Sequence, residues 1–304
     1  MNVQNPSASR GIVIQAVDLV KNYGTGSNMV HALRGVNVSF ERGKFTAIMG
    51  PSGSGKSTLM HTLAGLDSAT SGHILFGGAD LTRMDDKQLT LLRRHKIGFI
   101  FQSFNLLPMF TAEQNILMPL TLAGDKPDRA WFDLLVETLG LKQRLNHRPN
   151  ELSGGQQQRV AIARALITKS KLVFADEPTG NLDSVSSAEV LGFLKRSVNE
   201  LGQTIVMVTH DAVAASYADR AIVFADGQIV ADEANPTAET MNELLMAERE
   251  RATRTAVTST RADTLARLAG VKDVPNLPIT DAPLPPAGRT GTMRHARAAA
   301  QHAR

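Results

Sequence analysis

Nine residues, GPSGSGKST at positions 50–58, leave few folds open to this chain. They fit the pattern G-x-x-x-x-G-K-[ST]. The apolar run over 45–49 predicts a strand before them, and Leu59, Leu63 and Leu66 follow at helical spacing. We call residues 50–58 the phosphate loop, because the N–H groups of such a loop can converge on phosphate oxygens at the positive end of the following helix.

Every position of the phosphate loop is a candidate for binding, and two side chains carry specific chemistry. Lys56 supplies a mobile cation for the β- and γ-phosphates of a nucleotide. The Ser57 hydroxyl is suited to ligate Mg²⁺. The predicted contacts come from Gly50, Pro51, Ser52, Gly53, Ser54, Gly55, Lys56, Ser57 and Thr58.

A second glycine-rich motif, LSGGQ over residues 152–156, leads into QQRVAIARAL, whose apolar spacing predicts a helix. Ser153, Gly154 and Gly155, together with Gln156, place backbone N–H groups at the N-terminus of that helix, where an anion is favoured. We call residues 152–156 the LSGGQ loop. The chain therefore carries two separate loops suited to face phosphate.

The third motif is LVFADEP over 172–178, an apolar strand that ends in two adjacent carboxylates. Asp176 is suited to hold Mg²⁺ through its water shell. Glu177 is suited to orient or deprotonate an attacking water. The alternative is an acidic turn before Pro178 with no chemistry, which the phosphate loop in the same chain makes less favourable.

The apolar periodicity predicts an α/β fold in three parts. Residues 12–40 alternate in strand fashion and predict an antiparallel β-subdomain. The apolar pattern over residues of about 103–165 is mostly helical and predicts an inserted helical subdomain. Further apolar runs, which indicate a mostly parallel sheet, lie at 172–175, 205–208 and 221–225. A tight hairpin is expected at Asp226–Gly227.

Two helices are predicted with specific faces. Within the insertion, one face should carry Trp131, Leu134, Leu135, Thr138 and Leu139, before Gly140 ends the helix. After the acidic motif, Val190, Leu194, Val198 and Leu201 define the face of a second helix.

The charge and composition divide the chain into a flexible segment 1–10, a folded domain 11–248 and a tail 249–304. The tail contains ten Lys or Arg against four Asp or Glu, within a chain of 33 against 29. It also has five prolines between Pro275 and Pro286, so we expect disorder there. Because the basic excess belongs to the tail, nucleic acid is not an expected partner.

The composition also excludes several classes of protein. No apolar run approaches the roughly 18 to 20 residues needed to span a bilayer, and the first ten residues lack the apolar core of a secretory signal. A cytoplasmic protein is therefore expected. With no cysteine the chain can form neither a disulfide nor a zinc–thiolate site.

With these motifs in order over about residues 12–230, the chain resembles the ATPase subunit of ATP-binding-cassette (ABC) systems, whose cofactors are ATP and Mg²⁺. The resemblance implies that Tyr23 stacks on adenine and that His210, after the strand TIVMV, contacts the γ-phosphate. It implies that Gln102 senses the γ-phosphate and the permease and ligates Mg²⁺. It also implies that Asn181–Asp183 contacts the dimer partner, with Asp183 at the nucleotide.

In that family the LSGGQ loop of one protomer closes over ATP held by the phosphate loop of the other. The resemblance thus implies a homodimer with two composite sites and catalysis by Glu177, His210 and Gln102. It also implies a separate permease, with the chain bound peripherally to the inner face of the membrane. A non-transport nucleotide switch that acts on nucleic acid is the alternative.

Within the family, the segments ALRGVNVSF, FNLLPMFTAEQNILMPL and PTGNLD look like the lipoprotein-release and macrolide-export branch. The permeases of that branch have long extracytoplasmic domains, and export or extracytoplasmic mechanotransmission is implied. Residues 104–120 are either a groove for a permease helix or core of the insertion. For the basic tail, attraction to anionic lipid is a further hypothesis. The substrate and the identity of the permease do not follow from the sequence.

Overall fold

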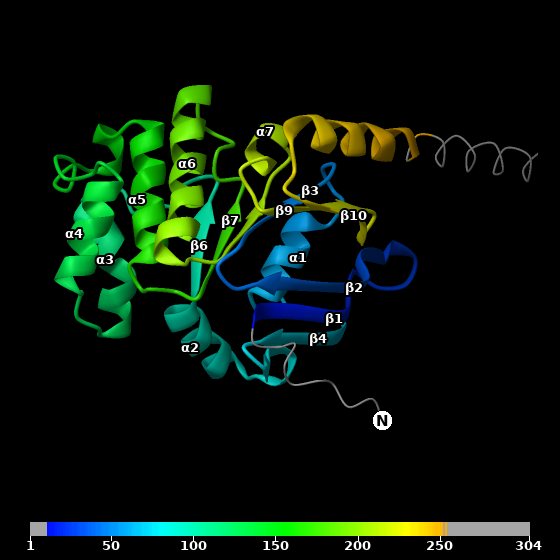
Figure 1. Cartoon of the computed structure of the whole chain (residues 1–304). Coiled ribbons are helices and arrows are strands. Elements are labelled where there is room, and N and C mark those ends of the chain that lie inside the picture. The colour runs from blue at the N-terminus through cyan, green and yellow to red at the C-terminus, as the bar shows by residue number, and fades with distance from the viewer. Residues whose placement is uncertain (1–10, 252, 254–304) are drawn as a thin grey trace, which may run out of the picture. The chain divides into compact units, whose positions relative to one another are not determined.

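The structure is a computed structural model that describes residues 11–251 and 253, and Figure 1 shows its two sheets with their surrounding helices. The expectations for the flexible segment 1–10 and for the tail from residue 254 onward lie outside the described residues.

The smaller sheet is antiparallel and forms the subdomain expected from residues 12–40. Its strands, in spatial order, are β2 (Val30–Glu41), β1 (Ile12–Tyr23), β4 (Ser71–Phe76) and β5 (Ala79–Asp80). The 3₁₀ turn η2 (Gly26–Asn28) joins β1 to β2. The predicted alternation at Val36, Val38 and Phe40 is confirmed, since all three side chains are buried.

The larger sheet is mostly parallel, as expected. Its strands, in spatial order, are β10 (Gln228–Ala234), β9 (Arg220–Ala225), β3 (Phe45–Met49), β8 (Ile205–Val208), β7 (Leu172–Asp176) and β6 (Ile97–Phe101). Only β10 pairs antiparallel, through the hairpin turn Asp226–Gly227, whose φ angles are 48° and 78°. Two positive φ values are what a tight I′-type turn requires, so the Asp-Gly prediction is confirmed.

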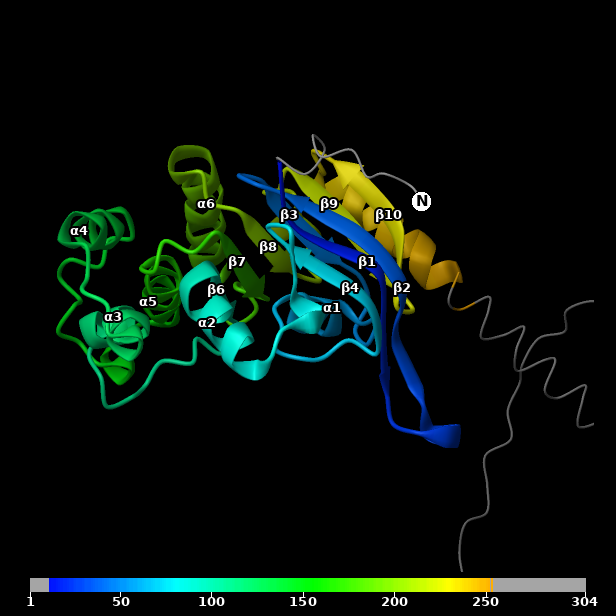
Figure 2. The same cartoon turned by 90° about the horizontal axis from the view of Figure 1, so that it is seen from below.

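Both faces of the larger sheet are covered, which explains why its central strands are continuous apolar runs. Along β7, Val173 and Ala175 pack into a cluster with the helical insertion, while Phe174 packs into a second cluster with the antiparallel sheet. Figure 2 shows the insertion on one side of the larger sheet and the antiparallel sheet on the other, as Figure 1 does. The larger sheet therefore ties the two subdomains together.

The helices of the core follow the strands. They are α1 (Lys56–Leu63), α2 (Asp86–Lys96), α6 (Ser184–Leu201) and α7 (Ala212–Ala215), with the 3₁₀ turn η3 (Leu81–Arg83) before α2. Leu66 does not continue α1 as expected, because Gly65 adopts φ 63° just after the helix and leaves Leu66 48% exposed.

The helical insertion lies between β6 and β7. It contains α3 (Ala112–Ala123), α4 (Arg129–Thr138), the 3₁₀ turn η4 (Pro149–Glu151) and α5 (Gly154–Leu166). The face expected for α4 was wrong in part: Leu134 and Thr138 are exposed, and the buried residues are Phe132, Leu135 and Val136. Phe132, Leu135, Val136 and Leu139 are spaced i, i+3, i+4 and i+7, which is one helical stripe, and Leu134 lies outside it.

A last helix spans 238–251, and residue 253 is also helical, so it continues beyond residue 248, where the folded domain was expected to end. This helix is held in place by the buried Met241 and the partly buried Leu244 and Leu245, which pack on the cluster that Val173 and Ala175 form with the helical insertion. Within residues 11–251 and 253, no helix is long and apolar enough to cross a membrane.

Candidate functional site

Four parallel strands bring the predicted catalytic motifs to one edge of the larger sheet. The strands β3, β8, β7 and β6 are neighbours in that order. At their carboxyl ends lie the phosphate loop, His210, the Asp176–Glu177 pair and Gln102. Carboxyl ends of parallel strands share one edge, where open α/β sheets bind ligands. Sequence positions more than 150 residues apart thus meet in one place.

The phosphate loop is held so tightly that two of its glycines cannot be replaced without displacing backbone. At Gly50 (φ 148°) an added Cβ would lie 1.9 Å from the carbonyl oxygen of Phe224. At Gly55 (φ 102°) it would lie 2.5 Å from the carbonyl oxygen of Ala32. The hairpin after β9 also binds the loop, since Gly227 N–H donates to the Ser54 carbonyl at 3.0 Å. The loop is therefore a preformed cradle.

Lys56 begins α1 and points back into this cradle. Its Nζ donates to the carbonyl oxygens of Gly50 at 2.9 Å and Pro51 at 2.8 Å. Burial lowers the pKa of Lys56, while the nearby Glu177 and Asp176 carboxylates act in the opposite direction. A buried ammonium inside an N–H-rich loop suits an anion with several charges.

A cavity of ≈ 600 Å³ opens beside the phosphate loop. Its wall includes Tyr23 at the end of β1, His31 and Arg34 on β2, and Asp226 of the hairpin, besides the loop itself. The Ser54 hydroxyl is buried in the loop and has no hydrogen-bond partner. Such an oxygen normally finds a partner, so the cavity fits the phosphates of a nucleotide.

Asp176 lies at the tip of β7 in a setting that fits a bound cation. Burial raises the pKa of Asp176, and Glu177 adds to the rise. His61, whose Nε2 lies 3.9 Å from the carboxylate, opposes it, as do the Ser57 hydroxyl and Lys56. A bound Mg²⁺ would lower the pKa of Asp176. The Asp176 carboxylate and the Ser57 hydroxyl beside it offer the oxygen ligands that Mg²⁺ prefers. Among the described residues, no group of three or more His, Asp or Glu could hold a metal by itself.

The Glu177 carboxylate and the His210 imidazole are in contact at the same edge. Glu177 Oε2 lies 2.7 Å from His210 Nδ1. Glu177 adopts φ 47°, which is rare for a residue other than glycine, and its N–H donates to the Val208 carbonyl at 2.9 Å. Both side chains line a second cavity of ≈ 640 Å³. The arrangement lets the imidazole orient the carboxylate.

Gln102, after β6, packs on the turn that follows Glu177. A Cβ added at Gly180 would lie 2.6 Å from Gln102 Nε2. The Asn181 side chain donates to the Gln102 carbonyl at 3.0 Å. Gln102 thus connects the turn after the acidic pair to the strand that leads into the helical insertion.

The LSGGQ loop starts α5 with a capping box. Gln156 N–H bonds to the Ser153 hydroxyl at 3.3 Å, and Ser153 N–H bonds to Gln156 Oε1 at 3.0 Å. Behind it, a Cβ at Gly155 would lie 2.9 Å from Ser186 Oγ on α6. Ser153 itself is exposed. None of residues 152–156 lines the ≈ 600 Å³ cavity beside the phosphate loop or the ≈ 640 Å³ cavity beside Glu177. The fold of one chain therefore does not bring the LSGGQ loop to Lys56.

Asp183, expected near the nucleotide, caps α6 in this structure. Its Oδ1 accepts from Val185 N–H at 3.0 Å and from Ser186 N–H at 2.9 Å, and its Oδ2 accepts from the Ser186 hydroxyl at 2.8 Å. The hydrogen bonds from Ser186 hold the pKa of Asp183 below its usual range. Its position beside the packed Gly155–Ser186 contact couples the turn at 181–183 to the LSGGQ loop.

Two features of the site were missed from the sequence. Gln158 is fully buried on α5 and donates to the Pro178 carbonyl at 2.7 Å, which joins the LSGGQ helix to the turn after Glu177. Its spacing with Ile162 and Ala165 puts a polar residue on a buried helix face, a signal that could have been read. The second is Asp67, which contacts Tyr23 and which no local pattern indicates.

Comparison with known proteins assigns the family. The family described as ABC transporter matches residues 33–180. The lipoprotein-releasing system ATP-binding protein LolD of Geobacter metallireducens is 48% identical over 222 residues, which are 72% of this chain and 99% of that protein. The macrolide export ATP-binding/permease protein MacB of Marinobacter nauticus is also 48% identical, but this chain spans only 34% of its length.

Solved structures agree with the sequence relatives. A dimeric ATP-binding cassette in a post-hydrolysis state, bound to ADP and Pi, matches with a TM-score of 0.67 and 39% identity, over 73% of this chain and 98% of that one. CbiO1 from Clostridium perfringens, part of an ABC transporter complex, matches with a TM-score of 0.67 and 29% identity, over 85% of this chain and all of that one. With this fold, these motifs and these relatives, the chain belongs to the ABC transporter family, as an ATP-binding and ATP-hydrolysing subunit that resembles the lipoprotein-release and macrolide-export branch.

Proposed function

We propose that two copies of this chain close over two Mg²⁺–ATP and drive a separate permease. The observation that carries the proposal is the division between the two anion-facing loops. The phosphate loop lies with Asp176, Glu177 and His210 at one sheet edge, whereas the LSGGQ loop starts a helix of the insertion and lines neither cavity. A second copy can supply the LSGGQ loop that each site lacks.

In the proposed site, binding falls to the phosphate loop and to Tyr23. Lys56 and the loop N–H groups hold the β- and γ-phosphates, and the Tyr23 ring is the platform for the base. Ser57, Asp176 and Gln102 would hold Mg²⁺, which neutralises charge on the phosphate oxygens when bound.

Hydrolysis in this scheme depends on Glu177. Its carboxylate orients a water toward the γ-phosphorus and accepts a proton as the water oxygen bonds to phosphorus. The bond to the β–γ bridging oxygen breaks, which gives ADP and inorganic phosphate. His210, 2.7 Å from Glu177, orients the carboxylate and turns to the γ-phosphate when nucleotide is present.

The LSGGQ loop, which contacts the partner protomer in other members of the family, supports the proposed dimer. Ser153 is exposed at the start of α5, where a helix N-terminus favours a phosphate across an interface. The turn 181–183 lies against this loop, because a Cβ added at Gly154 would lie 3.5 Å from Leu182 Cδ2 and 3.9 Å from the Asn181 carbonyl oxygen. A monomer lacks half of each site and should therefore hydrolyse ATP poorly.

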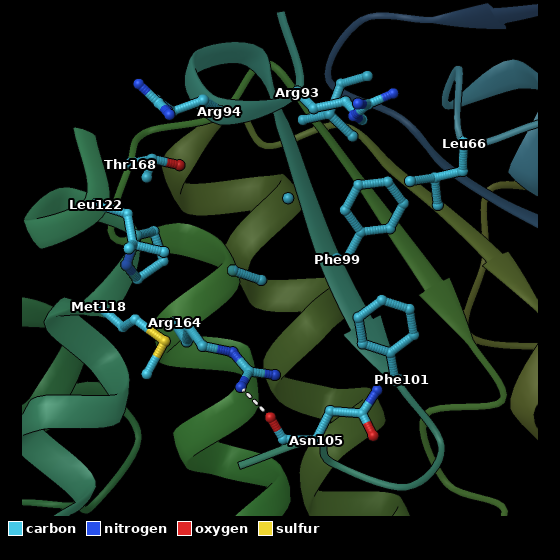
Figure 3. A pocket seen from close by; sticks show the side chains of 14 residues that line it. Leu66, Arg93, Arg94, Phe99, Phe101, Asn105, Met118, Leu122, Arg164 and Thr168 are labelled. Carbon is cyan, nitrogen blue, oxygen red and sulfur yellow. Dashed lines mark hydrogen bonds between the residues drawn. The ribbon is translucent and has the colours of Figure 1, made fainter. Parts of the chain in front are cut away.

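A groove between the core and the insertion is the proposed docking site for a cytoplasmic helix of the permease. Its volume is ≈ 450 Å³, and its apolar wall includes Phe99 and Phe101 of β6 and Met118 and Leu122 of α3. Figure 3 shows these side chains around the opening, with Arg94 at one end. Within residues 104–120 both alternatives find support, since Ile116 is fully buried in the core while Met118 lines the groove.

The relatives support the kind of partner. A permease with long extracytoplasmic domains, a role in export or mechanotransmission, and a place on the inner face of the membrane are proposals that follow from the likeness to LolD and MacB.

The test is ATP turnover by the purified chain together with its size by light scattering, for wild type and Glu177→Gln. We expect wild type to turn over, and the variant to bind ATP and become a stable dimer. A variant that binds ATP and remains monomeric at every protein concentration would refute the composite site.

A further inference from the structure

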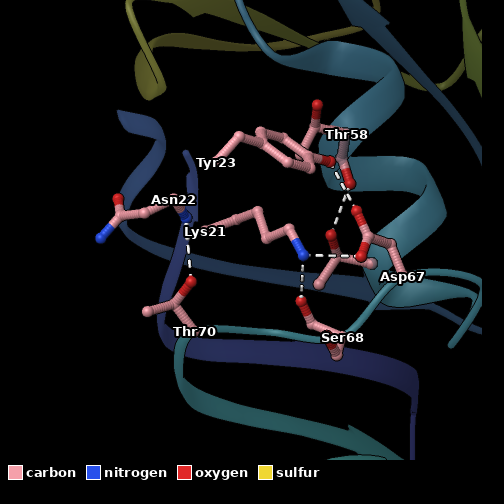
Figure 4. A network of polar contacts seen from close by, with 8 residues as sticks. Lys21, Asn22, Tyr23, Thr58, Asp67, Ser68 and Thr70 are labelled. Carbon is pink, nitrogen blue, oxygen red and sulfur yellow. Dashed lines mark hydrogen bonds and ion pairs between the residues drawn. The ribbon is translucent and has the colours of Figure 1, made fainter. Parts of the chain in front are cut away.

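The Tyr23 side chain is held at both its hydroxyl and its ring. The hydroxyl donates to Asp67 Oδ2 at 2.5 Å. Lys21 Nζ lies 4.8 Å from the centre of the Tyr23 ring and donates to Asp67 Oδ1 at 2.6 Å and to the Ser68 carbonyl at 2.7 Å. Figure 4 shows this network, with Thr58 of the phosphate loop beside the tyrosine hydroxyl. We call Lys21 and Asp67 the clamp.

The clamp joins three segments that are distant in sequence. Lys21 and Tyr23 share one face of β1, because side chains two apart on a strand point to the same side. Asp67 lies in the turn after α1, where its N–H donates to the His61 carbonyl at 3.3 Å. Thr58 lies in the first turn of α1 and hydrogen-bonds to the Tyr23 hydroxyl. The tyrosine is thereby fixed to the helix that carries Lys56.

Burial within the network is uneven. Lys21 is 7% exposed, whereas Tyr23 is 42% exposed and lines the ≈ 600 Å³ cavity of the phosphate loop. An aromatic ring held only for packing would be buried with its partners. Here Lys21 is covered, the Asp67 side chain is partly buried at 28% exposed, and the ring is presented to the cavity, which is the arrangement of a support behind a binding surface.

We propose that Asp67, with Lys21, is a positioning residue that fixes the Tyr23 ring beside the phosphate loop, so that the platform for the nucleotide base exists before ATP binds. The proposal rests on the proposed role of Tyr23 at the base and adds what holds the ring. An exposed tyrosine otherwise loses its rotamer freedom on binding, and a ring already immobilised avoids that cost. The carboxylate accepts one hydrogen bond on each oxygen, from Lys21 and from the Tyr23 hydroxyl, whereas an amide has only one accepting oxygen.

The test compares ATP with inorganic tripolyphosphate, which has the phosphates and no base. The full chain and its variants Tyr23→Phe, Asp67→Asn and the double variant are titrated with each probe by calorimetry. Each single variant should weaken ATP binding about three- to tenfold, from the regained side-chain freedom. Tripolyphosphate binding should be unchanged. The double variant should be no weaker than the weaker single variant, because both changes break one contact.

Asp80→Asn is the matched control. Asp80 is another carboxylate of the antiparallel sheet, bonded to His73 at 2.9 Å and to the Thr82 hydroxyl at 2.6 Å, and it lines neither motif cavity. This variant should bind both probes as wild type does. Thermal unfolding of every variant, with and without ATP, separates loss of fold from loss of the ring position.

Three results would overturn the proposal. Equal losses for ATP and tripolyphosphate would mean that Asp67 supports the phosphate loop and not the ring. Additive losses in the double variant would mean that Asp67 acts without the Tyr23 hydroxyl. If Asp67→Asn binds ATP as tightly as wild type does, the proposed role of Asp67 is refuted and the proposed function still stands. If the wild-type chain binds neither probe, the proposed function itself is refuted.

Discussion

The phosphate loop and the LSGGQ loop use the same local chemistry in opposite settings. Each is a Ser/Gly loop at a helix N-terminus. The phosphate loop is enclosed by the sheet edge and the hairpin, and the Lys56 ammonium is buried inside it. In the LSGGQ loop the capping box satisfies the N–H groups of Ser153 and Gln156, and the Ser153 side chain is exposed. The phosphate loop has its surroundings within one chain, whereas the LSGGQ loop needs a partner.

The difference shows that a motif does not define a site by itself. The phosphate loop has its own cation in Lys56, and tertiary contacts add the nearby carboxylates and a cavity wall. The same fold gives the LSGGQ loop only a rigid backing against α6. The first loop should therefore govern binding in one chain, and the second should matter only when two chains meet.

The largest expected effect removes chemistry and leaves both loops intact. Glu177→Gln should slow turnover by on the order of 10²- to 10⁴-fold, because it removes the group that orients and deprotonates the water. ATP affinity should stay within about twofold, since the phosphate loop is unchanged. Steady-state turnover and calorimetric titration with ATP measure the two quantities. A comparable loss of affinity would mean that Glu177 acts in binding.

Lys56→Ala should weaken ATP binding by on the order of 10- to 100-fold, the value of a charge-assisted hydrogen bond to phosphate. The loss should already appear in the monomer, because Lys56 lies inside the phosphate loop of its own chain. Calorimetric titration at concentrations where the chain stays monomeric measures it. Affinity that falls only when dimers form would contradict the comparison.

Ser153→Ala should affect turnover and not the binding of ATP by the monomer, which is the opposite of Lys56→Ala. Turnover should fall by about tenfold through the lost contact across the dimer, while the ATP affinity of the monomer remains that of wild type. The variant also loses a helix cap, which costs about 1 kcal/mol of stability.

Thr111→Ala is the control for that cap. Thr111 and Gln114 form the same capping box at the start of α3. This variant should lose about as much unfolding free energy as Ser153→Ala and keep wild-type turnover. If both variants lose turnover equally, helix stability and not the interface explains the effect.

The smallest effect concerns the charge buried beside the phosphate loop. Because burial raises the pKa of Asp176 above 3.8 in the folded state, the fold binds this proton more tightly than the unfolded chain does. Its contribution to stability should therefore decrease as pH rises from about 4 through the raised pKa. Urea unfolding without Mg²⁺ or nucleotide should show a shallower decrease for Asp176→Asn than for wild type. Parallel curves for the two proteins would contradict this account.

Much of the phosphate loop and its surroundings could be predicted from the sequence, because the signals are local. The strands β3 and β8 have the predicted bounds, and Asp226–Gly227 turns as its φ preference requires. The error at Leu134 arose because the apolar residues of α4 allow two stripes, and the prediction left out Phe132 and Val136, which the fold buries with Leu135. Leu66 was misplaced because a glycine ended the helix first.

Contacts between distant segments could not be predicted in the same way. The Tyr23–Asp67 bond joins the end of β1 to the turn after α1, and Gln158 reaches Pro178 from a different helix. These contacts depend on how the subdomains pack, which no periodicity encodes.

The most direct test of the two-loop account uses the absence of cysteine in the natural chain. Ser52 and Ser153, both exposed, one in each loop, are replaced by cysteine in the Glu177→Gln background, and mild oxidation follows with and without ATP and Mg²⁺. We predict a covalent dimer that forms only with ATP and disappears on reduction. A disulfide within a single chain, seen as a faster-migrating monomer, or the same yield of dimer without ATP would contradict the claim that each site takes its second loop from a partner.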